Sequence, residues 1–219
     1  MVGFVCPSTC AAAWQPIWHR GQNSLNNVIE ISLSDASAAF QRAVHELSQT
    51  ELRSELVITQ IPSPKGLAKE AVAFTADVSS EHISDTADAG TGRFVLLHEP
   101  KPQEQWGGVF RIITFSKSPL ETLIGADEMI SEVSWAWLLE ALENRSAEYS
   151  HEAGTTTRII SSGFGSLAGQ SDHAELEMRA SWSPAGDIAK HFAAWQDLIC
   201  MMSGYPLFPS EPTRLNRVK

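Results

Sequence analysis

Charged or titratable side chains occur inside stretches of the sequence that are otherwise apolar: His98, Glu99, Arg111, Arg158, Glu177 and Arg179. A guanidinium group withdrawn from water needs a carboxylate or carbonyl partner, because an unpaired buried charge costs several kcal/mol. One interpretation is an anionic ligand held by bidentate arginines. The other is a set of ion pairs in which Arg111 and Arg179 meet the two glutamates on neighbouring strands. We favour the ion pairs, since opposite charges commonly face each other across β-sheets.

A catalytic interpretation rests on His98 and Glu99, because histidine titrates near neutral pH and can serve as a general acid or base. A nucleophile in a recognisable motif is missing. Ser161 and Ser181 fall inside predicted strands, whereas a catalytic serine of that kind sits on a sharp turn between a strand and a helix. The Gly-Phe-Gly run at 163–165 lacks the glycine spacing of a phosphate loop. We therefore predict a hydrogen-bonded structural role for His98, with catalysis as the alternative.

Seven tryptophans form the second group of candidates: Trp14, Trp18, Trp106, Trp135, Trp137, Trp182 and Trp195. Tryptophan is enriched at the energetic centres of protein interfaces. Trp135 and Trp137 are about 200° apart around a helix, so one of them is expected to point away from the sheet. That residue, together with Trp106 in a loop, could mark a partner surface. The alternative is a second core layer.

The three cysteines, Cys6, Cys10 and Cys200, are scattered and odd in number. This pattern argues against a disulfide framework and favours a reducing compartment. His19 lies near the first two cysteines, but together they leave a zinc ligand set incomplete. We therefore predict no metal site, no cofactor and a cytoplasmic location.

Composition excludes several classes of partner. Of 219 residues, 43% are hydrophobic and 19% are charged, which is typical of one globular domain. The formal net charge of −10 repels polyanions, so direct nucleic-acid binding is not expected. The longest nearly apolar stretch, 188–202, is shorter than the roughly 20 residues that a membrane helix requires. We predict no membrane segment.

Hydrophobic periodicity predicts an α+β fold. Apolar residues at helical spacing predict helices from 34 or 35 to 47, from 127 to 144 and from 188 to 202. β-branched runs and alternation predict strands at 55–61, 71–78, 93–99, 109–116, 154–164 and 174–182. Strands joined by loops alone pair antiparallel. We predict an antiparallel sheet of five or six strands packed by helices, in the order α-β-β-β-β-α-β-β-α. Without its first strand, this order resembles that of bacterial secretion chaperones.

The same pass along the chain predicts three regions. Residues 1–33 lack a sustained period and are expected to form a poorly ordered N-terminal extension. Residues 34–205 are expected to form a single α+β domain. Residues 206–219 are proline-rich and then basic, and we expect a frayed C-terminal tail.

Several motifs carry a family resemblance: TGR at 91–93, LLHEP at 96–100, EVSWAWL at 132–138 and EMRASWSP at 177–184. With these motifs, the chain from about Phe40 to Pro212 resembles an uncharacterised actinobacterial family catalogued as a domain of unknown function, number three thousand. The resemblance implies an actinobacterial cytoplasmic protein with no established activity, cofactor or substrate. Relatives are often encoded beside a ribonuclease D-like exonuclease, which hints at RNA metabolism.

We favour a non-enzymatic protein-binding or regulatory domain that holds a protein partner, with a homodimer as one form. The ligand or interface candidates are Trp106, Arg111, Trp135, Trp137, Arg158, Glu177, Arg179 and Trp182. The alternative is an enzyme or binder acting on a small anionic ligand through His98, Glu99, Arg111 and Arg179. A third hypothesis is an accessory factor in RNA metabolism. Convergence of the four ligand residues in an open concavity would favour the alternative, and burial in closed ion pairs would favour the interaction domain.

Overall fold

The order of helices and strands expected from the sequence is confirmed in the computed structural model, which describes residues 36–79, 90–169 and 172–207. The helices are α1 (Ala38–Ser48), α2 (Thr122–Ala126), α3 (Ile130–Asn144) and α4 (Ile188–Met202), with a 3₁₀ helix η2 (Gly165–Leu167). The strands are β1 (Leu56–Ile61), β2 (Glu70–Val78), β3 (Thr91–Gln103), β4 (Gly108–Leu120), β5 (Tyr149–Ser161) and β6 (His173–Pro184). The short α2 was not expected. The predictions for 1–33, Trp14, Trp18, Cys6, Cys10 and the end of the tail lie outside the described residues.

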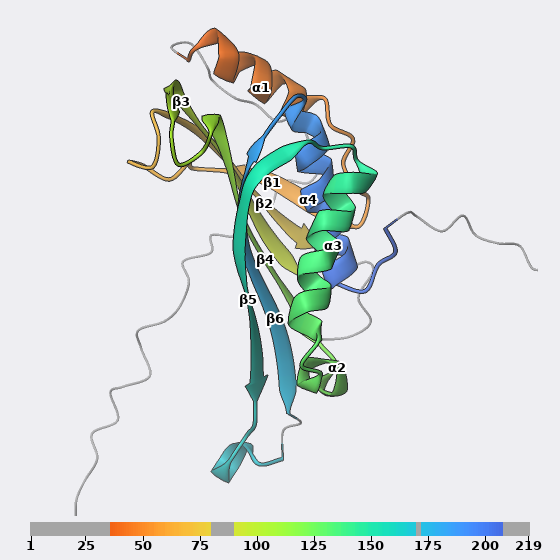
Figure 1. Ribbon diagram of the computed structural model, residues 1–219. Coiled ribbons are helices and arrows are strands. Elements are labelled where there is room, and N and C mark those ends of the chain that lie inside the picture. The colour runs from red at the N-terminus through yellow and green to blue at the C-terminus, as the bar shows by residue number, and fades with distance from the viewer. Residues whose placement is uncertain (1–35, 80–89, 170–171, 208–219) are drawn as a thin grey trace, which may run out of the picture.

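The strands form one antiparallel sheet in the order β1-β2-β3-β4-β6-β5. Neighbours along the chain are neighbours in the sheet, except that β6 lies between β4 and β5. The chain leaves β4, passes through α2 and α3, and returns as β5 at the edge of the sheet. Figure 1 shows α2, α3 and α4 on one side of this sheet.

The main core lies between the sheet and the helices. Alternation along β6 follows the prediction: Leu176, Met178, Ala180 and Trp182 face the helices and are buried, while Glu177 and its odd-numbered neighbours face the other way. Helix α4 contributes most to this core, and 11 of its 15 residues are buried. It approaches β3 closely at Gly92, where a Cβ atom would lie 2.3 Å from the Ile199 side chain.

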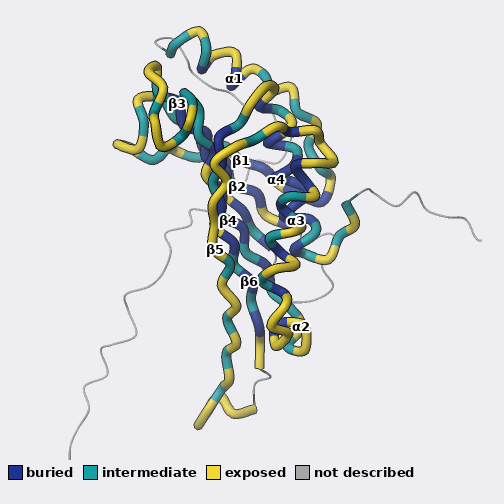
Figure 2. Tube along the Cα trace, viewed as in Figure 1, coloured by how far each residue is buried: buried dark blue, intermediate teal, exposed yellow. Residues whose placement is uncertain are grey.

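The opposite side of the sheet carries a smaller apolar cluster. Ala73, Val95 and Leu97 are buried there beneath partly buried neighbours that include Trp106. Trp106 belongs to the turn between β3 and β4, and its packing on this cluster explains why a loop tryptophan is half-buried. Figure 2 shows that exposed residues run along much of β5, the strand at the sheet edge. In the described parts of the chain, no helix is both long and apolar enough to cross a membrane.

Candidate functional site

His98 and Glu99 lie on opposite faces of the sheet, because successive side chains of a strand alternate. His98 faces the helices and is only 3% exposed. Its Nδ1 atom lies 2.5 Å from Oε2 of Glu70, the residue opposite it on β2. Glu99 instead accepts a hydrogen bond from the backbone N–H of Lys69, at 2.8 Å. The two residues therefore do not form the acid–base pair that their adjacency in sequence suggested.

Ser37 completes the cluster around His98. Glu70 accepts hydrogen bonds from the backbone N–H and the hydroxyl of Ser37, at 2.5 and 2.6 Å. The Ser37 Oγ atom also accepts from the N–H of Phe40, so Ser37 is the N-cap of α1, which begins later than predicted. Both Ser37 Oγ (3.4 Å) and Glu70 approach the same ring nitrogen of His98. In a catalytic triad, the carboxylate and the nucleophile contact opposite ring nitrogens of the histidine. Here both contact Nδ1 of His98, which is not the geometry of a triad. The cluster instead holds α1 against the sheet.

Glu70 should make the fold sensitive to acid. Burial opposes ionisation of Glu70, but hydrogen bonds from Ser37 and His98 outweigh it, so the pKa lies below the ordinary 4.5. A lowered folded-state pKa stabilises the protein above the unfolded-state pKa, and this contribution is lost as pH falls through the folded-state value. We expect Glu70→Gln to lower the free energy of unfolding by about 1–3 kcal/mol at neutral pH. Urea unfolding should show that this difference shrinks below about pH 4. If Glu70→Gln lowered the free energy of unfolding equally at neutral and at acid pH, ionised Glu70 would not be the group that stabilises the fold.

A second buried cluster joins α4 to the segment before β1 and to the end of α3. Asp197 of α4 is 1% exposed and accepts hydrogen bonds from Arg53 (3.1 Å) and from Arg145 (2.6 and 3.0 Å). Arg53 also pairs with Glu55 at 2.5 Å and donates to the carbonyl oxygen of Leu207 at 2.7 Å. Burial alone would lower the pKa of Arg53, but the surrounding carboxylates raise it. Every charge of this cluster has a partner, which indicates a structural ion-pair network.

This network, and not the predicted one, is where a buried arginine, Arg53, meets carboxylates. Sequence reasoning missed it because Arg53 and Asp197 are 144 positions apart and no local pattern relates them. The nearby Cys200 is a buried free cysteine, and burial raises the pKa of its thiol to about 12. Such a thiol is protonated at neutral pH and cannot act as a thiolate nucleophile.

Arg111 has hydroxyl and carbonyl partners instead of the predicted glutamate. It donates to Ser181 Oγ at 2.6 Å, to Ser183 Oγ at 3.1 Å and to the His151 carbonyl oxygen at 2.8 Å. Burial lowers the pKa of Arg111. Ser183 in turn donates to the carbonyl oxygen of Trp106. Arg111 therefore joins β4 to β6 and to the start of β5, and Ser183 links these residues to the β3–β4 turn.

Arg158 likewise donates hydrogen bonds to backbone carbonyl oxygens. Its Nη1 atom lies 2.7 Å from the carbonyl oxygen of Asp127 and near those of Gly125 and Ala126. These carbonyls are at the end of α2, where a helix leaves acceptors without partners and favours a positive charge. Arg158 thus caps α2, a helix that the periodicity did not reveal.

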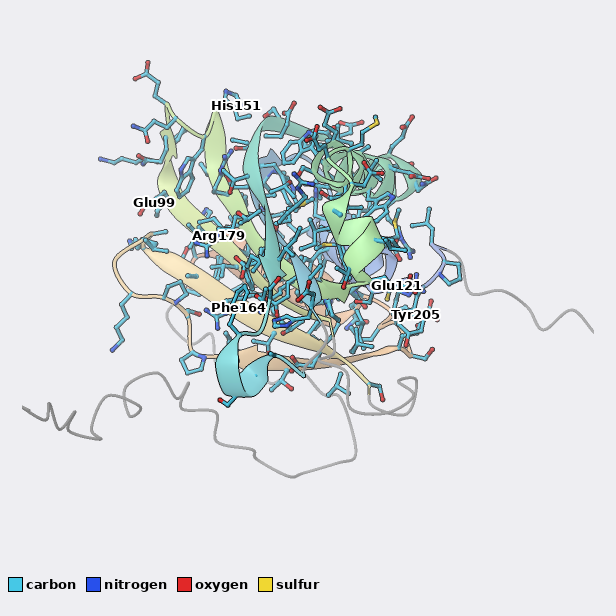
Figure 3. All side chains as sticks on the ribbon, turned by 90° about the horizontal axis from the view of Figure 1, so that it is seen from below. Glu99, Glu121, His151, Phe164, Arg179 and Tyr205 are labelled. Carbon is cyan, nitrogen blue, oxygen red and sulfur yellow. The ribbon has the colours of Figure 1, made fainter. Side chains whose placement is uncertain are left out.

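Glu177 and Arg179 do form an ion pair, but it runs along one strand, β6, instead of across two strands as predicted, and it is long and exposed. Arg179 Nη2 lies 3.8 Å from Glu177 Oε2, and the Arg179 side chain is 71% exposed. Its guanidinium carbon lies 5.5 Å from the centre of the Phe115 ring, within the range of a cation–π contact. In Figure 3, Arg179 and Glu99 lie on the side of the sheet away from the helices.

Register places a second arginine on the other side of Phe115. Arg93 of β3 pairs with Phe115 of β4, and Phe115 pairs with Arg179 of β6. The described part of the chain contains no ion pair for Arg93. Around this row lies a shallow hollow of about 400 Å³ lined by Arg93, Val95, Ile113, Thr114, Phe115 and Arg179. We call this surface the open face.

The tryptophan candidates are mostly part of the core. Trp182 is fully buried, so it cannot belong to a surface in this fold. Trp135 and Trp137 are both half-buried and pack against the main core. Trp135 covers Gly154 of β5, where a Cβ atom would lie 2.5 Å from its ring. Neither Trp135 nor Trp137 projects freely into solvent, because the apolar stripe of α3 is wide enough for both rings to contact the core. Trp106 borders the open face, because it packs against the cluster that contains Val95.

The four residues of the small-ligand hypothesis do not converge, since His98 faces the helices and the other three do not. No group of three or more metal-binding side chains comes together among residues 36–79, 90–169 and 172–207. What the structure defines is an α+β protein in which, among the described residues, helices cover one sheet face and leave the other open. Residues 36–211, well over half of the chain, match the family described as protein of unknown function (DUF3000). The chain belongs to this family. No curated protein and no solved structure matches it.

Proposed function

We propose that this chain is a non-enzymatic, cytoplasmic protein-binding or regulatory domain that holds a partner protein on its open face. The observation that carries the proposal is the row Arg93, Phe115 and Arg179, in which two arginines flank an aromatic ring over a hollow of about 400 Å³. Arginine and aromatic side chains are enriched at the energetic centres of protein interfaces. The free thiol of Cys200 is consistent with a reducing cytoplasm.

The chemistry of the row suggests what the partner presents. Ile113 beside it is 37% exposed, and Phe115 is half-buried, so the floor of the hollow is apolar. The two guanidinium groups can donate hydrogen bonds to carboxylates of a partner, since Arg93 has no ion pair in the described ranges and that of Arg179 is long. A partner segment with an apolar side chain between acidic ones would match both features.

The small-ligand alternative has less support. Its four residues lie on two faces, and Arg111 already donates to Ser181, Ser183 and His151. A role in RNA metabolism would have to operate through a protein contact, because the net charge of −10 opposes binding to a polyanion.

The test is a charge reversal on the open face. We expect the double variant Arg93→Glu/Arg179→Glu to lose the partners that the wild-type chain retains in affinity purification from its native cells. For a retained partner that is then purified, titration calorimetry should show a dissociation constant raised by at least about tenfold, because like charges now face each other. The same titration with inorganic phosphate and small dicarboxylates tests the ligand alternative.

The matched control is Arg42→Glu/Lys190→Glu, which makes the same change in net charge on exposed positions of α1 and α4. We expect it to retain the partners with unchanged affinity. Equal retention by both double variants would show that the open face does not bind the partner, and heat released only with small anions would favour the alternative.

A further inference from the structure

Strand β5 is an uncovered edge of the sheet. It pairs with β6 on one side only, and no described element pairs with its other side. A sheet edge presents a row of backbone N–H and C=O groups that can pair with another strand. β5 has 13 residues, most of them exposed (Figure 2), so this row is long.

The two edges of the sheet differ in how they are protected. β1, at the other edge, has only six residues and is followed by Pro62, and shortness and proline are ordinary devices against edge pairing. β5 has a bulge between Ser150 and Ala153, with His151 at a φ of 55°. That bulge protects only the start of the strand. From Ala153 to Thr157 the strand is uncharged, regular and free of proline and lysine.

The sequence of β5 is complementary to itself in one antiparallel register. Two copies related by a twofold axis at Thr155 would place Thr155 opposite its own counterpart, and Ala153 opposite Thr157. In the same register Glu152 of each copy meets Arg158 of the other, so opposite charges lie at both ends of an uncharged centre. A register centred on Arg158 would place two arginines together. The twofold symmetry of most homodimers requires such self-complementarity.

We propose that β5 is a homodimer interface, in which two copies pair antiparallel about Thr155 and join their sheets into one continuous sheet. Thr155 lies beside Arg179 of β6, at the end of the row of Arg93, Phe115 and Arg179. Pairing of the β5 edges uses backbone groups, so the side chains of this row stay accessible in each copy. Dimerisation would place two such rows on one continuous surface, which suits a partner that repeats its binding segment.

The first test is Thr155→Lys in the full chain, measured by sedimentation velocity over a range of concentrations. Lysine at this exposed position would face the same lysine of the other copy, and like charges directly opposite destabilise a sheet pair. We expect a monomer–dimer equilibrium in the wild type and a dissociation constant raised at least about fivefold in the variant. Thr157→Lys, which would face Ala153 of the other copy and lies beside Glu177 of its own, is the comparison variant and should raise the dissociation constant less. A wild type that is monomeric at about 100 µM, or equal effects of the two lysines, would overturn the proposal.

A charge exchange tests the register. Glu152→Arg and Arg158→Glu each create like pairs in their own homodimers, but a mixture of the two variants restores opposite charges at both contacts. We expect each variant to dimerise more weakly than the wild type, and the mixture to form a heterodimer. A mixture no tighter than its components would contradict the Thr155-centred register. Because Arg158 also caps α2, hydrogen exchange of the wild type provides an independent measurement: the amides of 153–158 should become more protected as concentration rises, and unchanged protection would count against the interface.

Discussion

Asp197→Ala is expected to lower the free energy of unfolding by about 3–5 kcal/mol, because it removes one partner from a buried ion-pair network. Asp197 is almost fully buried and accepts three hydrogen bonds, two from Arg145 and one from Arg53. Without Asp197, the Arg53 guanidinium is still paired with Glu55. Its other side is then left without a carboxylate in a place that water does not reach. Chemical unfolding in urea, followed by circular dichroism, measures the difference.

The matched control for this prediction is Glu177→Ala, which also removes a carboxylate paired with an arginine. That pair is 3.8 Å long and its arginine is mostly exposed, so we expect a loss below about 1 kcal/mol. A loss of similar size for the two alanine variants would show that burial of the Asp197 network contributes nothing beyond a surface ion pair. Asp197→Asn, which keeps the shape of the side chain but not its charge, should fall between the two.

Periodicity predicted the fold well because burial repeats along each element. The alternation of Leu176, Met178, Ala180 and Trp182 determined which face of β6 meets the helices, and the structure places all four in the core. The start of α1 was predicted too early. Ser34, Asp35 and Ser37 are all chemically able to cap a helix, and a tertiary contact decides among them: Glu70 of β2 holds Ser37.

The candidate site was harder to predict because it depends on register across strands. Arg179 was identified from its place in an apolar strand, but nothing near it in sequence indicates that Phe115 and then Arg93 lie beside it. The predicted partners of Arg111 were carboxylates, and the strand pairing supplies two serine hydroxyls instead. His98 was expected to be hydrogen-bonded, and the structure gives it a partner, Glu70, that lies opposite it on β2 and far from it in sequence.

Trp182 shows how an interface candidate can prove to be the centre of the core. The side chain is fully buried, and its indole Nε1–H donates to His191 Nδ1 at 3.1 Å. Burial lowers the pKa of His191, which keeps the ring neutral so that Nδ1 can accept this hydrogen bond. The proton on Nε2 then points toward the carbonyl oxygen of Ala185, at 3.4 Å. Trp182 therefore connects the sheet to α4 by packing and by a buried hydrogen bond.

Trp182→Ala is expected to destabilise the protein by about 3–5 kcal/mol, since it leaves a large cavity and an unpaired acceptor on His191. Trp182→Phe separates the two effects, because it keeps most of the apolar volume and loses the hydrogen bond; we expect a loss of about 1–3 kcal/mol. Thermal and urea unfolding of both variants measure these losses. If Trp182 acted at an interface instead, Trp182→Ala would leave unfolding unchanged and weaken only partner binding. The affinity assay used for Arg93→Glu/Arg179→Glu would reveal that outcome, which would contradict the packing described for β6 and α4.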